Sequence, residues 1–119
     1  VPLDELGRLA SRSRERVAIS NVCVVFAETE IIGLLADGAA AEDIVAGVQA
    51  AVAGRIATMA GRKVSSPTAL TGGVALVSGM DQALSRVLGQ PVRIAPEPQM
   101  TGALGAALLA ADGAGRDRR

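Results

Sequence analysis

The chain has 119 residues, half of them hydrophobic, with twelve Lys or Arg balancing twelve Asp or Glu. Zero formal net charge and a single aromatic residue, Phe26, argue against nucleic-acid binding, which uses a basic surface and stacking rings. The lack of histidine excludes an imidazole base or a His-containing zinc site within the chain, and the lone Cys23 excludes an intrachain disulfide.

The apolar residues are spread along the chain, and no run approaches the roughly 18–20 residues of a membrane span. A charged-then-apolar signal segment is also missing from the start of the sequence. The sequence therefore predicts a soluble, cytoplasmic protein that does not associate with a membrane.

A first helix is predicted over residues 2–11, where apolar residues recur at helical spacing after Pro2. Residues 11–16 are rich in charge and are interpreted as a solvated helix end or loop. A phosphate-binding role for Arg12, Arg14 or Arg16 is the alternative.

A second helix is predicted over residues 23–36, with Ser20 and Asn21 as candidate N-caps and a stop at Asp37-Gly38. Taken alone, residues 22–26 also resemble a strand, since they hold three valines and a phenylalanine. The longer helical periodicity favours the helix. Its predicted buried stripe consists of Val24, Ala27, Ile31, Leu34 and Leu35.

A third helix is predicted over residues 41–61, with Glu42 and Asp43 in its first turn and Arg62-Lys63 after its end, as the helix dipole favours. Glycines inside it, at Gly47 and Gly54, predict close packing against a neighbour. Its predicted buried stripe consists of Ile44, Val48, Val52, Ile56 and Met59.

The next segment predicts a short buried strand after Pro67, a turn at Gly72-Gly73, and a helix that ends at Gly89. The inward residues of this helix are expected to be Met80, Leu84, Val87 and Leu88. Paired glycines after a strand allow positive φ and close approach of a ligand, and α/β folds bind phosphate-bearing ligands at that edge. A tight turn without a ligand is the alternative, because the stretch matches no phosphate-loop motif.

Residues 91–95 predict a second strand, and residues 99–111 a last helix of mostly small side chains. The glycines of this helix predict that its backbone lies directly against a sheet or a ligand. Residues 112–119 are expected to be a disordered tail, which leaves residues 1–111 as the folded part. Two strands are too few for a stable open sheet, so we expect further chain to complete it.

Cys23 is placed near the predicted start of a helix, where unpaired amides and the helix dipole favour a thiolate. A thiolate can bind a metal or an iron–sulfur cluster. The alternative is a small buried hydrophobic residue. A cluster held by this chain alone is excluded, because such clusters usually take four cysteines.

Three stretches together resemble one family: residues 21–38 with Cys-x-Val-Phe-Ala-Glu-Thr-Glu, residues 71–75 with Thr-Gly-Gly-Val-Ala, and residues 98–108. They resemble the carboxyl-terminal part of the ATP-dependent activators of 2-hydroxyacyl-CoA dehydratases and the related ATP-binding subunits of benzoyl-CoA reductase. This resemblance covers about residues 1–111. It implies an α/β fold, the helix-rich carboxyl-terminal portion of a ribonuclease-H-like ATPase domain of the actin and heat-shock-chaperone type.

The resemblance also implies the site residues and partners. Gly72, Gly73, Val74 and Gln99 are expected to contact ATP or ADP with Mg2+, while the small helix at 102–107 packs beneath the same cleft. Cys23 is expected to be one of two cysteines per subunit that hold a [4Fe–4S] cluster between the subunits of a homodimer. ATP hydrolysis then drives one electron to a CoA-thioester dehydratase or reductase in anaerobic metabolism.

The family's other cluster cysteine and its amino-terminal phosphate loop are absent from this sequence. The chain alone is therefore expected neither to hydrolyse ATP nor to hold a complete cluster. Two alternatives stay open at this point: a non-enzymatic helical interaction module, or a piece of a kinase-like ATPase without a cluster.

Overall fold

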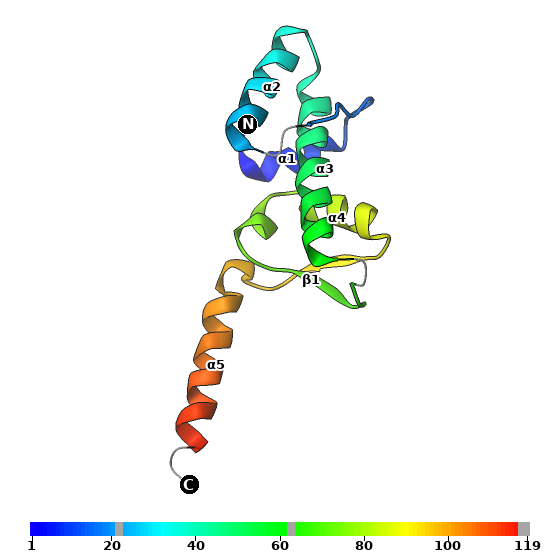
Figure 1. Ribbon diagram of the computed structural model, residues 1–119. Coiled ribbons are helices and arrows are strands. Elements are labelled where there is room, and N and C mark those ends of the chain that lie inside the picture. Colours follow the sequence, from blue (N-terminus) through cyan, green and yellow to red (C-terminus); the bar gives the residue numbers. More distant parts are fainter. Residues whose placement is uncertain (21–22, 62–63, 117–119) are drawn as a thin grey trace.

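The computed structural model describes the backbone of residues 1–20, 23–61 and 64–116. Five α-helices and two strands lie in these ranges, together with three short 3-10 helices (Figure 1). The α-helices are α1 Leu6–Ala10, α2 Val24–Ala36, α3 Ala41–Ala60, α4 Met80–Leu88 and α5 Thr101–Arg116. The strands are β1 Thr68–Leu70 and β2 Val92–Ile94, and the 3-10 helices are Leu3–Glu5, Gly73–Leu76 and Pro98–Met100.

The order of elements and most of their bounds agree with the sequence predictions. The helix expected at 41–61 is α3, and the helix expected to end at Gly89 is α4, whose last turn is followed by Gly89 at φ 67°. The basic residues Arg62 and Lys63, which were expected to follow the end of α3, lie outside the described residues. Periodicity therefore located these two helices correctly, because α3 and α4 each bury one face against a neighbour.

The two strands form a parallel sheet in which Thr68 pairs with Val92 and Leu70 with Ile94. Beyond the strands, the Ala95 amide donates to the Leu70 carbonyl at 3.1 Å. A parallel pair needs a crossover connection, and α4 with the preceding 3-10 helix provides it. The position of α4 therefore fixes both strands and the turn between them.

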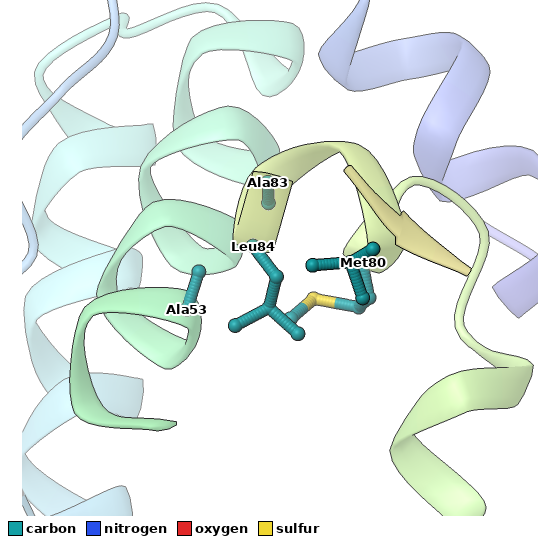
Figure 2. Close-up of a cluster of buried hydrophobic side chains, with 5 residues drawn as sticks. Ala53, Met80, Ala83 and Leu84 are labelled. Carbon is teal, nitrogen blue, oxygen red and sulfur yellow. The ribbon is translucent and has the colours of Figure 1, made fainter. Parts of the chain in front are cut away.

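The hydrophobic core lies where α4 packs between α3 and β2 (Figure 2). Leu84 is 2% exposed and Ala53 of α3 is 0% exposed. A methyl side chain at Ala53 allows α4 to approach α3 closely, and Leu84 then fills the space beside it. The core cluster consists of Ala53, Met80, Ala83, Leu84 and Val92.

The buried faces of the helices differ in part from the predicted stripes. Met59 of α3 is 82% exposed, Val87 of α4 is 48% exposed and Leu35 of α2 is 52% exposed. The reason for Met59 is length: α3 has twenty residues and α4 only nine, so much of α3 has no helix to cover it. The buried residues of α3 are Ile44, Gly47, Gln49 and Ala53.

The first half of α3 also holds the segment that leads from α1 towards α2. Asp43 accepts three hydrogen bonds at one carboxylate oxygen, from the Ser13 hydroxyl at 2.7 Å and from the amides of Arg14 and Glu15 at 2.9 and 3.0 Å. One turn further along, Gly47 lies directly against the backbone of Val17, where a Cβ would collide with the carbonyl oxygen. The predicted close packing is thus confirmed at Gly47. It is wrong at Gly54, where an added Cβ meets no described atom within 4 Å.

The last helix, α5, departs from its expected place. It leads away from the other elements (Figure 1), and a Cβ built at Gly102 or Gly105 meets nothing within 4 Å. Among the described residues these glycines therefore do not pack against the sheet of β1 and β2, and their expected contact with a ligand stays a prediction. Leu104, Leu108 and Leu109 are 60–74% exposed, since no other described element covers them.

The end of α5 also differs from the prediction. Its helical backbone includes residues 112–116, which the sequence placed in a disordered tail, because the hydrogen-bond ladder continues past Ala111. Residues 117–119 lie outside the described residues.

Replacing the central core side chain tests the packing of α4. Leu84→Ala leaves a cavity between α3 and α4 and is expected to lower the free energy of unfolding by about 2–5 kcal/mol. Urea denaturation of the purified protein measures the change. Met59→Ala is the matched control because its side chain is exposed, and it should shift stability by less than about 0.5 kcal/mol. Equal effects of the two substitutions would contradict this core.

The carboxylate of Asp43 predicts a pH dependence of stability. Hydrogen bonds, first from the Ser13 hydroxyl and then from the Glu15 amide, hold the pKa of Asp43 below its usual value. Its contribution is therefore complete above the unfolded pKa, near about 4, and is lost as the pH falls through the lower folded value.

We expect Asp43→Ala to lower the Tm at pH 7, and the gap from wild type to close only below about pH 4. Thermal unfolding followed by circular dichroism between pH 3 and 7 measures it. Asp37→Ala, an exposed aspartate at the end of α2, is the control. A gap of constant size across this range would refute the assigned role of the Asp43 carboxylate.

Candidate functional site

The predicted strand–turn–helix is present at the carboxyl end of β1. Gly72 has φ 85° and ψ −179°, and its amide donates to the Pro98 carbonyl at 2.7 Å. A left-handed φ of this size strains any residue with a side chain, so the turn requires glycine here. The sequence did not reveal that a 3-10 helix, Gly73–Leu76, intervenes before α4.

A second segment lies beside this turn, after β2. Glu97 has φ 43°, an uncommon value outside glycine, and the Met100 amide donates to its carbonyl at 2.8 Å. The Gln99 side-chain amide also reaches the Glu97 carboxylate, at 3.5 Å. The bond from the Gly72 amide to the Pro98 carbonyl joins the two segments, so the structure brings the predicted residues Gly72–Val74 and Gln99 to neighbouring turns.

The outer surface of the glycine turn is open. A Cβ built at Gly72 or Gly73 meets no atom within 4 Å, and Val74 is 43% exposed. Bare backbone at the carboxyl end of a parallel strand is accessible to a large ligand, and this is the geometry that nucleotide sites in α/β folds use. Other turns also have this shape, so the ligand is not identified by the turn itself.

The far end of the turn is fixed by a residue that sequence reasoning missed. The Gln49 side-chain amide donates to the Ser78 carbonyl at 2.7 Å, although Gln49 is only 7% exposed. Gly79, at φ 88°, lies against the Cα of Gly7 and against this side chain. An isolated glutamine among alanine and valine in α3 was the available signal, because a buried amide needs a specific partner.

Cys23 stands at the start of α2 as its N-cap, with φ −85° and ψ 129°. The Ala27 amide donates to its carbonyl at 2.9 Å, which begins the helical ladder. The thiol is free and exposed. It is therefore not the small buried residue of the alternative interpretation, and it is open to a ligand approaching from outside this chain.

Ser20, the predicted N-cap, instead bonds to a glutamate within the helix. Its amide donates to the two carboxylate oxygens of Glu30 at 3.1 and 3.2 Å, and its hydroxyl donates to one of them at 2.8 Å. The other candidate cap, Asn21, lies outside the described residues. The reason for the error is spacing, since Ser20 precedes α2 by too many residues to reach its first-turn amides.

The two predicted sites lie in different parts of the molecule. Figure 1 shows α2 beside the first half of α3, whereas the glycine turn lies near the second half. An open groove bordered by Thr58, Val64 and Gln90 includes neither of them. Among the described residues, no three His, Cys, Asp or Glu side chains gather in a way that could hold a metal ion.

The fold places the chain in a class of proteins. A solved structure, the activator of the 2-hydroxyisocaproyl-CoA dehydratase from Clostridium difficile with bound ADPNP, superposes on 99% of this chain and 44% of its own, with a TM-score of 0.85 and 41% identity. The chain therefore has the fold of a portion of an actin-like ATPase, consistent with the carboxyl-terminal portion predicted.

The family follows from the sequence match. The model of the BadF/BadG/BcrA/BcrD ATPase family matches residues 1–110, so the chain belongs to this family. The 2-hydroxyisocaproyl-CoA dehydratase activator of Clostridioides difficile is 42% identical over 94% of the chain and 42% of its own length. One of the subunits of benzoyl-CoA reductase from Thauera aromatica is 32% identical over 91% of the chain and 41% of its own length.

The family resemblance read from the motifs is thus confirmed. The chain spans less than half the length of these relatives. None of the described helices is long and apolar enough to cross a membrane.

Proposed function

We propose that this chain is part of an ATPase that couples ATP hydrolysis to one-electron transfer, with a CoA-thioester dehydratase or benzoyl-CoA reductase as the cytoplasmic electron acceptor. The observation that carries the proposal is the fold match to an activator whose structure holds ADPNP, at 41% identity. Family membership over residues 1–110 supports the ATPase part, and the named relatives support the class of acceptor.

Nucleotide binding is assigned to the open glycine turn and the segment beside it. An added Cβ at Gly72 or Gly73 would meet no atom within 4 Å, Val74 is 43% exposed, and Gln99 is exposed on the neighbouring segment. Mg2+ is expected to arrive with the phosphates of ATP or ADP, as it usually does in such sites. This turn forms one wall of the nucleotide site.

Cys23 is assigned as one ligand of a [4Fe–4S] cluster shared across a homodimer. The donor fits the group: a thiolate is the usual ligand of such clusters, and this thiol is exposed at a helix start, where it can face a second copy of the protein. A bound cluster supplies a one-electron redox centre. The chain contributes a single thiolate, so the remaining ligands come from outside these 119 residues.

Two adjacent glycines give a test of the nucleotide site. Gly72→Ala is expected to destabilise the protein by about 1–3 kcal/mol, because φ 85° with ψ −179° is a backbone conformation that essentially only glycine adopts. Gly73→Ala has no such strain and open space around the new Cβ, so stability should hold. We expect this second variant to weaken ADP binding by about tenfold, or about 1.4 kcal/mol, measured by isothermal titration calorimetry. Unchanged affinity would remove Gly73 from the proposed site.

Replacing the thiol separates the proposed function from its alternatives. In the complete ATPase that contains this chain, purified anaerobically, Cys23→Ser is expected to lose its iron and its electron transfer while ATP binding is retained. The helix that begins after Cys23, α2, lies beside the first half of α3, whereas the glycine turn lies near its second half (Figure 1). Iron analysis and ATP titration measure the two properties. No loss of iron, or no iron in the wild type, would favour a cluster-free ATPase or a non-enzymatic interaction module.

A further inference from the structure

The segment that carries Cys23 is held to α2 by one carboxylate. Glu30 accepts the Ser20 amide at both of its oxygens, at 3.1 and 3.2 Å, and the Ser20 hydroxyl at 2.8 Å. Hydrogen bonds to an ionised acceptor are stronger than neutral ones, and these come from both the backbone and the side chain of one residue. Ser20 is thereby fixed relative to the helix.

In the sequence, Cys23 lies between Ser20 and Glu30: it follows Ser20 by three residues and precedes Glu30 by seven. Seven residues are about two helical turns, or about 10 Å along the axis, so Cys23 and Glu30 are on nearly the same face of the helix. On its helical side, the Cys23 carbonyl is held by the Ala27 amide at 2.9 Å. On its other side, three residues earlier, Ser20 is bound to Glu30.

The thiol itself has no such restraint. Cys23 makes no side-chain cap hydrogen bond, and its side chain is exposed. A metal-ligating residue whose geometry is set by its surroundings loses affinity when those surroundings loosen, typically by about 10- to 100-fold.

We propose that Glu30 is a positioning residue for Cys23: by holding Ser20 against α2, it fixes the thiolate in the orientation in which it binds the cluster. This inference rests on the proposed function, since it assumes that Cys23 is a cluster ligand. Glu30 does not ligate the cluster. It acts on the cluster only through the backbone of the segment that precedes α2.

The test compares cluster retention in Glu30→Ala, Glu30→Gln and Ser20→Ala with the wild type. Each substitution is made in the complete ATPase that contains this chain, and each protein is purified anaerobically, reconstituted with ferrous iron and sulfide, and mixed with an iron(II) chelator such as bathophenanthroline. We expect iron release to be about 10- to 100-fold faster in Glu30→Ala. Smaller increases are expected in Glu30→Gln, which keeps an acceptor oxygen, and in Ser20→Ala, which keeps the amide donor.

The matched control is Glu28→Ala. Glu28 belongs to the same helix and is exposed, so its loss removes the same charge without touching Ser20. A general charge effect would accelerate both glutamate variants equally and would overturn the proposal. A second readout is the electron paramagnetic resonance spectrum of the reduced cluster, which should broaden in Glu30→Ala because the thiolate orientation is less uniform.

A double-mutant cycle tests whether the effect of Glu30 depends on its contact with Ser20. If Glu30 acts through Ser20, adding Ser20→Ala to Glu30→Ala should accelerate iron release little beyond Glu30→Ala alone. Independent, additive effects of the two substitutions would overturn the proposal. Should Glu30→Ala fail to fold by circular dichroism, Ser20→Ala alone decides: faster release supports the proposal and unchanged release overturns it.

The proposed function and the inference about Glu30 fail in different ways. Absence of iron in the reconstituted wild type of the complete ATPase contradicts the proposed function. A stable wild-type cluster that Glu30→Ala and Ser20→Ala release at the wild-type rate contradicts only the inference about Glu30. ADP affinity should be the same in all of these proteins, which shows that the nucleotide part of the fold is intact.

Discussion

The packing of α4 against α3 is the contact on which the other elements depend. Leu84 is buried against the completely buried Ala53, and the small side chain at Ala53 sets how closely the two helices approach (Figure 2). Because α4 lies in the crossover between β1 and β2, its position also determines the parallel pairing of the strands. The glycine turn at Gly72 leaves β1 within this crossover, so the geometry of the candidate nucleotide site follows from helix packing.

A second role of α3 is to hold the backbone of two other segments in place. Asp43 accepts hydrogen bonds from residues 13–15, Gly47 lies against Val17, and Gln49 donates to the carbonyl of Ser78. Three positions within two turns of one helix thus contact the segment leading to Cys23 and the end of the glycine turn. Both candidate sites are therefore attached to the same rigid element, although they lie at different parts of it.

The two sites also differ in what the chain supplies. At the glycine turn, an open backbone is held from behind by Gln49 and by the contact between Gly7 and Gly79. At Cys23, the chain supplies a single exposed thiol, and Ser20, three residues earlier, is bound to Glu30. Each is a partial site, and a relative more than twice the length of this chain has room for the remaining parts.

The sequence by itself determined the order of elements, the glycine requirement at the turn and the family. These depend on local spacing: 3.6-residue periodicity, a glycine where φ is positive, and a motif of eight residues around Cys23. The tertiary structure alone decided which residues of the predicted stripes stay exposed and which polar groups pair. Met59 is exposed because α4 is short, and α5 has no cover for its leucines among the described elements. Gln49 and Glu30 contact residues 29 and 10 positions away, and no local pattern specifies such partners.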